Sequence, residues 1–162
     1  MILTGCLRNV ESAYKTINWE SIVLFAAMIP LATAMEKTGT SAAISGGIVS
    51  GLGPYGPIAV LAGIYLTTSF LTLFLSNTAT AVLFAPIALQ AALDMGVNPK
   101  AFLFAVTVAA SMCFASPFST PPNALVMSAG RYTFMDYVKI GLPLQILYAI
   151  VMIIVLPLLF PF

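Results

Sequence analysis

The chain contains no histidine, and acidic and basic residues together make up only 7% of its 162 residues. Its two cysteines, Cys6 and Cys113, lie far apart and do not form a metal-binding spacing. A zinc site or a Ser-His-Asp triad therefore lacks its components. The formal net charge is +1 without a cluster of basic residues, which argues against nucleic acid as a partner.

The few charged residues are also unevenly distributed. Hydrophobic residues make up 60% of the chain and its mean hydropathy is +1.05, whereas a soluble domain carries roughly 25% charged residues. The segments without Asp, Glu, Lys or Arg are Ser21–Met35, Thr38–Leu93, Ala101–Gly130 and Ile140–Phe162. A helix needs roughly 20 mostly apolar residues to cross a bilayer, and these segments supply several such lengths. The sequence predicts an all-α integral membrane protein.

Turn-forming and polar residues divide the apolar segments into shorter helices. The predicted helical stretches are Trp19–Met35, Ser41–Gly53, Ile58–Leu75 with a continuation to Leu93, Ala101–Ala115, and Leu142–Leu159. Two interruptions are expected inside apolar sequence, at residues 76–80 and at residues 116–123. These interruptions are the unusual feature of the chain, because each places small uncharged polar residues at bilayer depth.

Both interruptions are followed by a new helical start. Ser76 and Asn77 are residue types that begin helices, and the pair Pro121-Pro122 suits a first turn. Where one helix ends, carbonyl oxygens favour a cation, and where the next begins, N–H groups favour an anion. Paired interruptions of this kind predict the site of a secondary transporter. A structural role is the competing interpretation, because Ser and Thr also join membrane helices and proline kinks them.

At these residues the sequence resembles the divalent anion/sodium symporter family, the citrate-transporter-like permeases. The motif Ser76-Asn77-Thr78 lies within TLFLSNTATAVLFAPIAL, and the second interruption lies within SPFSTPPNALVMSAG. MIPLATAMEKTG and RYTFMDYVKIGLPLQ resemble flanking helices, so the likeness covers nearly the whole chain. The resemblance implies one half of an inverted-repeat transporter, with a re-entrant hairpin at the first motif and an unwound helix at the second.

The resemblance also implies a set of binding residues. The sodium ligands would be Thr72, Ser76, Asn77 and Ser119, the last through its backbone. The substrate carboxylate or oxyanion would meet Asn77, Thr78, Thr120 and Pro121. Hydroxyl, amide and carbonyl oxygens suit a hard cation. No other metal and no cofactor is expected, and Na⁺ is the coupling ion.

The chain carries one Ser-Asn-Thr motif and one Pro-containing interruption, whereas the family has a second, earlier set. We therefore expect residues 1–162 to form a single domain that corresponds to the C-terminal repeat, with the N-terminal half in the same or another chain and a homodimer when complete. Leu3-Thr4-Gly5-Cys6 also looks like a lipoprotein cleavage box, but the basic and apolar segments that such a signal needs do not precede it.

The expected function is sodium-coupled transport of a small divalent anion, a di- or tricarboxylate or sulfate, by a multi-pass protein of the plasma (inner) membrane. A non-transporting fragment or assembly subunit is one alternative. A relative in the wider ion-transporter superfamily with another substrate, such as arsenite, is a second alternative. An enzyme is not expected, because the apolar segments hold no acid, base or metal ligand.

Overall fold

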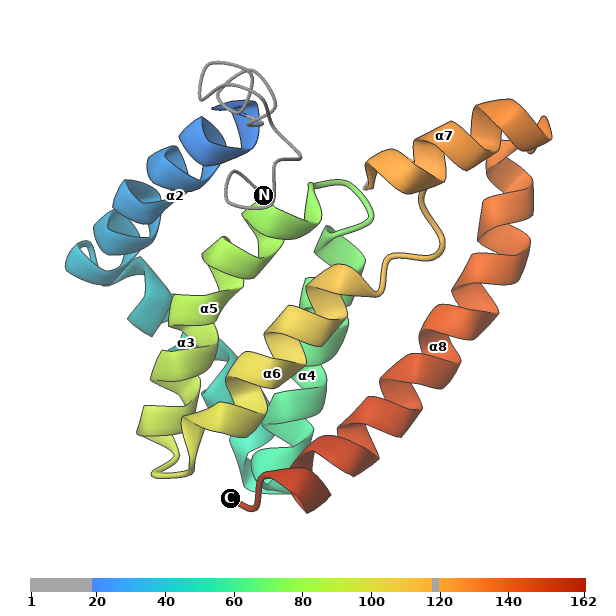
Figure 1. Ribbon diagram of the computed structural model, residues 1–162. Helices are drawn as coiled ribbons and strands as arrows, with labels where there is room; N and C mark the ends of the chain where they lie inside the picture. Colours follow the sequence, from blue (N-terminus) through green and yellow to red (C-terminus); the bar gives the residue numbers. More distant parts are fainter. Residues whose placement is uncertain (1–18, 118–119) are drawn as a thin grey trace, which may run out of the picture.

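The computed structural model describes residues 19–117 and 120–162, and these residues are helical without a β-strand. The elements are α2 (Trp19–Lys37), α3 (Thr40–Leu52), the 3₁₀ turn η1 (Gly53–Tyr55), α4 (Pro57–Leu71), α5 (Asn77–Asp94), α6 (Pro99–Ser111), α7 (Pro121–Gly130) and α8 (Phe134–Leu159). The all-α prediction is confirmed for this part of the chain. In Figure 1, α4, α5 and α6 form the centre of the bundle, and α8 runs obliquely along its right-hand side from the end of α7.

Local sequence explains where the central helices begin. Pro57 starts α4 directly after Gly56, whose φ of 93° is a conformation that favours glycine. The side chain of Asn98 accepts a hydrogen bond from the Lys100 N–H at 3.1 Å, and Pro99 follows as the first residue of α6. Each start thus combines a cap or a glycine with a proline that fixes the first turn.

The start of α8 is fixed by a capping box. The backbone N–H and the hydroxyl of Thr133 donate to Asp136 Oδ2 at 2.8 and 2.7 Å. In return, the Thr133 side chain accepts from the backbone of the third helical residue. This reciprocal pair sets the register of α8, and therefore which of its side chains point toward the bundle.

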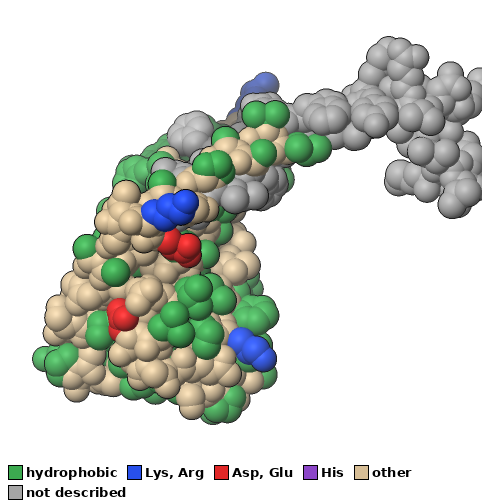
Figure 2. All heavy atoms as spheres, turned by 90° about the vertical axis from the view of Figure 1, so that its left-hand side faces the viewer, with side chains coloured by type: hydrophobic (Ala, Val, Ile, Leu, Met, Phe, Trp, Pro, Cys, Tyr) green, Lys and Arg blue, Asp and Glu red, His purple; other side chains and the backbone are tan. Residues whose placement is uncertain are grey.

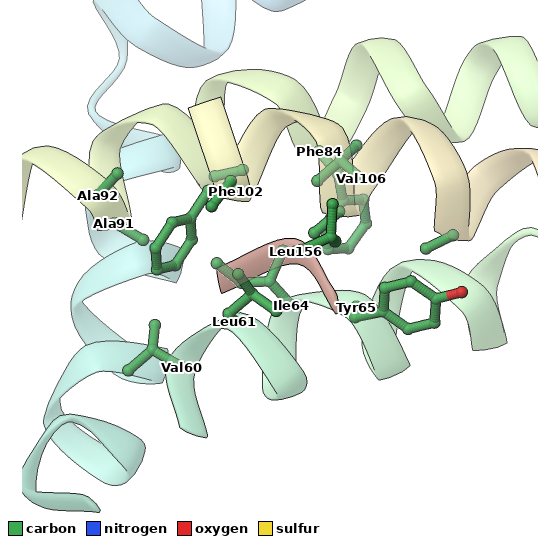
Figure 3. Packing of buried hydrophobic residues seen from close by; sticks show 14 of the residues in the cluster. Val60, Leu61, Ile64, Tyr65, Phe84, Ala91, Ala92, Phe102, Val106 and Leu156 are labelled. Atoms are coloured by element: carbon green, nitrogen blue, oxygen red, sulfur yellow. The ribbon is translucent and has the colours of Figure 1, made fainter. Parts of the chain in front are cut away.

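The core is built from α4, α5, α6 and α8. Figure 3 shows Leu61 and Ile64 of α4 directed toward Phe102 of α6, with Leu156 of α8 beside them. Alanine is the most frequent buried residue of α5 and α6, and small side chains allow helices to approach closely. The buried alanines of these two helices are Ala88, Ala91, Ala92, Ala101, Ala105, Ala109 and Ala110. Helix packing by small side chains therefore fixes the spacing of the central helices.

Among the helices in the described ranges, α8 alone is long and apolar enough to cross a bilayer. Its 26 residues correspond to about 39 Å, more than the roughly 30 Å of hydrocarbon. Its outward side chains are exposed, including Ile140 at 74% and Leu158 at 74%.

Seen from the side on which α2 lies, the surface carries few and scattered charged side chains (Figure 2).

Several predicted boundaries were wrong. The first interruption covers residues 72–76 rather than 76–80, because α5 already begins at Asn77. The second begins earlier than predicted, since α6 ends at Ser111, and it ends at residue 120, where α7 begins. The last helix begins at Phe134 rather than at Leu142. These shifts have one cause: hydropathy marks where polar residues lie, whereas caps and turns decide where the helical hydrogen bonds stop.

Candidate functional site

The two interruptions lie at the same end of the bundle. In Figure 1, α4 and α6 both end there, and α5 and α7 both begin there. A contact joins the two irregular segments directly, since the Cys113 Sγ lies 3.4 Å from the carbonyl oxygen of Thr72. Two helix ends that expose carbonyl oxygens and two that expose N–H groups are thus gathered in one region.

Thr72 is at the centre of the first interruption. It follows the last turn of α4 and is completely buried. Its Oγ1 lies 3.1 Å from the Asn77 Oδ1 and 3.0 Å from the carbonyl oxygen of Ala110. The hydroxyl has one hydrogen to share between these two acceptors. The Ala110 carbonyl is one of the last four of α6, so it has no partner within a continuing helix.

These three atoms, Thr72 Oγ1, Asn77 Oδ1 and Ala110 O, are called the oxygen cluster below. Hydroxyl, amide and backbone carbonyl oxygens are ligands that hard cations prefer. A cation among them would satisfy all three at once, whereas the single hydroxyl hydrogen cannot serve both acceptors fully. The chemistry of the cluster therefore fits a small cation such as sodium.

The start of α5 offers the opposite polarity. Ser76 is the N-cap in an extended conformation, and its Oγ accepts from the Ala79 N–H at 3.3 Å. The N–H groups of Asn77 and Thr78 belong to the first turn, which has no helical acceptor for them. They lie at the positive end of the helix dipole, where an anion is favoured. Asn77 thus contributes its side chain to the oxygen cluster and its backbone to the anion-favouring end.

The second interruption is organised by Asn123, in the first turn of α7. Its Nδ2 donates to the carbonyl oxygens of Cys113 and Ser116, each at 3.3 Å. Thr120 is the N-cap residue, yet its side chain makes no capping hydrogen bond. Pro121 follows as the first residue of α7, and proline has no N–H to offer. The Thr120 hydroxyl is therefore available for another purpose than capping.

The structure brings only part of the predicted site together. Thr72 and Asn77 are in hydrogen-bond contact, and Ser76 and Thr78 are their neighbours in the same turn. Thr120 and Pro121 begin α7 on the other interruption. Among the described residues, no hydrogen bond links either of them to the oxygen cluster. Ser119 lies outside the described residues.

Sequence reasoning missed three contributors to the site. The Ala110 carbonyl had no signal, because a backbone atom becomes a ligand only through the place where α6 ends. Cys113 was judged by the lack of a metal-binding spacing, and its contact with Thr72 depends on the fold. Asn123 could have been found, since an Asn after two prolines within an apolar run needs a partner.

A groove with a volume of about 260 Å³ borders α8 and the second interruption. It is mainly aromatic and aliphatic in character. Its lining residues are Phe114, Tyr132, Asp136, Tyr137, Ile140, Gly141 and Leu144. None of the described predicted ligands contributes to this lining, so the groove is separate from the oxygen cluster.

The described residues form an all-helical fold in which interrupted helix ends converge, an arrangement typical of secondary transporters. The sequence profile of the citrate transporter family matches residues 1–109 and 61–162, and the chain belongs to that family. The family resemblance inferred from the sequence is confirmed.

Three relatives illustrate the range of the family. The chain is 47% identical over 163 residues to the uncharacterized transporter YfbS of Escherichia coli, covering 99% of this chain and 27% of the relative. It is 36% identical over 152 residues to sodium/sulfate cotransporter 2 of Chlamydomonas reinhardtii, covering 93% and 17%. It is 33% identical over 144 residues to Na(+)/dicarboxylate cotransporter 3 of Rattus norvegicus, covering 89% and 24%.

These relatives are transporters and not enzymes, as the sequence predicted for this chain. The chain spans about a quarter or less of the length of each relative. An integral membrane protein follows from the family and agrees with the apolar length of α8.

Proposed function

We propose that this chain is part of a sodium-coupled secondary transporter of a small divalent anion, a di- or tricarboxylate or sulfate. The observation that carries the proposal is the oxygen cluster, in which Thr72 Oγ1 lies 3.1 Å from Asn77 Oδ1 and 3.0 Å from Ala110 O. Sodium coupling is further supported by the names of two relatives, a sodium/sulfate and a Na(+)/dicarboxylate cotransporter.

In this proposal sodium binds first. The Thr72 hydroxyl turns its hydrogen away, and the three oxygens of the cluster then face the ion. Ser76 and the backbone of Ser119 complete the shell. The positive ion lies next to the start of α5, so it adds to the potential of the helix end and prepares the site for an anion.

The anion then binds to the polar groups that the two helix starts offer. The first-turn N–H groups of Asn77 and Thr78 supply donors at the start of α5. The Thr120 hydroxyl, which does not cap α7, supplies another donor at the second interruption, next to Pro121. The chain's own residues thereby bind and orient the ion and the anion, and no covalent step is involved.

The remaining parts of the transporter belong to the same proposal. The chain covers 27% of the length of the Escherichia coli relative, which supports a larger remaining part of the protein, including an N-terminal half, in the same or another chain. Alternating access needs one bundle to move against another. The α4–α5 pair would be the re-entrant hairpin and α6–α7 the unwound helix of one inverted repeat. The complete protein would be a multi-pass homodimer of the plasma (inner) membrane.

The test is anion uptake by the complete gene product in proteoliposomes. Labelled succinate, citrate and sulfate are offered under an inward sodium gradient or under an equal potassium gradient. We expect uptake of at least one anion with sodium only, and loss of this sodium dependence in Asn77→Ala. Asn98→Ala is the matched control, because Asn98 caps α6 in a solvent-exposed turn at another place.

Uptake that potassium supports as well as sodium would contradict the coupling. Sodium-driven uptake that Asn77→Ala leaves unchanged would contradict the assignment of the site.

A further inference from the structure

One face of α8 contacts the second interruption and the two helix ends beside the site, the last turn of α4 and the first turn of α7. Tyr137, Gly141 and Gln145 are spaced four residues apart, so they lie above one another on the same side of the helix. The Tyr137 hydroxyl donates to the carbonyl oxygen of Asn123 at 2.9 Å. The other two residues contact the second interruption and the end of α4 respectively. A single helix therefore touches the segments that carry the candidate site.

Gly141 allows α8 to rest directly on irregular backbone. A Cβ at this position would overlap the carbonyl group of Phe114 and would lie 2.7 Å from the backbone nitrogen of Ala115. These are backbone atoms, so no side-chain rotation can make room. The absence of a side chain at Gly141 thus sets how closely α8 approaches the second interruption.

Gln145 holds the end of α4. Its Nε2 donates to the carbonyl oxygen of Ser69 at 3.1 Å and to the Ser69 Oγ at 2.6 Å. Ser69 lies three residues before Thr72, and its carbonyl is one of the last four of α4, which a helix leaves without an internal partner. Gln145 therefore acts as an external cap for the helix end that leads into the oxygen cluster.

Gln145 also lowers the stability of the fold at its position. It lies in the part of α8 that has no charged residue, Ile140 onward, and its Oε1 is buried without a hydrogen-bond partner among the described residues. A buried polar atom without a partner destabilises the fold. The donor side of the amide thus has a role at Ser69 that an apolar side chain would not fulfil.

A chain of polar contacts also joins α8 to the oxygen cluster. Tyr137 contacts the Asn123 backbone, and the Asn123 side chain donates to the Cys113 carbonyl at 3.3 Å. The Cys113 Sγ then contacts the carbonyl oxygen of Thr72, whose hydroxyl belongs to the cluster. Together with Gln145, this chain connects α8 to the cluster from two directions.

We propose that Tyr137, Gly141 and Gln145 are positioning residues that set the sodium affinity of the oxygen cluster without touching the ion. They fix the distance between the end of α4, which carries Thr72, and the second interruption, which follows Ala110. The inference rests on the proposed function, because it concerns the sodium site proposed above.

The test measures the half-saturating sodium concentration in the complete gene product. The first readout is sodium-driven anion uptake. The second is the rate at which a maleimide modifies Cys113 at increasing sodium, followed by mass spectrometry of the Cys113 peptide. Cys113 is buried and contacts Thr72, so we expect sodium to slow its modification. This second readout does not require transport.

Gln145→Leu removes the cap of α4 and keeps a similar volume. We expect about a three- to thirtyfold rise in half-saturating sodium, the range for residues that act on a site through their neighbours. Maximal uptake at saturating sodium should stay close to that of the wild type. Gln90→Leu is the matched control, because Gln90 donates to Asp94 within α5 and does not contact the site.

Gly141→Ala should produce the same rise, while Gly47→Ala, which faces open space on α3, should not. If these variants do not accumulate in the membrane, Tyr137→Phe removes only the hydroxyl and answers the same question.

A half-saturating sodium concentration that is unchanged in Gln145→Leu or Tyr137→Phe would overturn the inference, even if maximal uptake falls. Failure of the proposed function is a distinct result: sodium would then neither drive uptake nor slow Cys113 modification in the wild-type protein.

Discussion

The substitution Thr72→Val examines the oxygen cluster with little change in shape. Valine keeps the branched form of threonine and removes the one oxygen that lies between Asn77 and Ala110. Thr72 is completely buried, so water does not replace the lost hydroxyl. The change therefore affects the cluster and leaves the packing around α4 nearly intact.

Two effects of different size are expected. In the absence of sodium, the Ala110 carbonyl loses its donor, and a buried acceptor without a donor costs about 1–3 kcal/mol. Sodium at a hundred times its dissociation constant stabilises the wild-type protein by about 2.7 kcal/mol, and a tenfold weaker site at that concentration gives only about 1.4 kcal/mol. The variant should thus be less stable and also less responsive to sodium.

Thr68→Val is the matched control. Thr68 lies one turn before Thr72, within α4, is equally buried, and its hydroxyl donates to the Ile64 carbonyl oxygen at 2.7 Å. That carbonyl is also the acceptor for the helical N–H four residues later, so loss of the hydroxyl leaves it satisfied. We expect Thr68→Val to cost less than Thr72→Val and to keep the full response to sodium.

The assay is thermal unfolding of the purified protein in detergent, in sodium chloride or in choline chloride at equal ionic strength. The decisive quantity is the difference, for each variant, between the unfolding temperature in sodium chloride and that in choline chloride. An equal sodium response in the wild type and in Thr72→Val would refute the reasoning. So would a Thr68→Val protein that loses its response to the same extent.

Three further predictions concern other parts of the chain. Ser76→Ala removes the cap of α5 and should lower stability by about 1 kcal/mol in thermal unfolding, while Ser76→Asp keeps an acceptor; equal loss in both variants would contradict the capping role. Ser45→Ala removes the hydroxyl that donates to the Asp94 Oδ2 at 3.1 Å and should lower the free energy of unfolding by about 1 kcal/mol. Ser50→Ala, on the exposed side of α3, should change it by less than about 0.5 kcal/mol. Similar effects at both sites would contradict the link between α3 and the end of α5. A tag fused to Phe162 at the native locus distinguishes the two arrangements of the missing half: a membrane band well above 17.1 kDa on a gel would contradict a separately encoded half, and a stable band near that mass would contradict a longer single chain.

The sequence was a good guide to the interruptions and a poor guide to their limits. Ser76 and Pro121 were predicted near new helical starts and do stand there, because a cap and a first-turn proline act locally. The ends of α4 and α6 were placed too late, since Leu73, Phe74 and Ala115 are apolar and still lie outside helices. Hydropathy does not distinguish an apolar turn from an apolar helix.

In the candidate site, too, the local features were predicted from the sequence and those that depend on helix packing were not. Thr72 and Asn77 were named from the sequence, and their contact across the first interruption follows from a short loop. The Ala110 carbonyl and the contact of Cys113 with Thr72 depend on how α4 packs against α6. No local pattern encodes that packing. The role of Gln145 was likewise not predicted, although a lone amide in an apolar, charge-free segment marks a position that needs a hydrogen-bond partner.

The measurement that tests the central claim most directly is simultaneous flux of both solutes. Proteoliposomes that contain the complete gene product are given radioactive sodium together with labelled succinate or sulfate. The account predicts that each solute accelerates the uptake of the other, and that Thr72→Val weakens this mutual effect while Thr68→Val does not. Anion uptake that proceeds without any sodium entry would contradict the account.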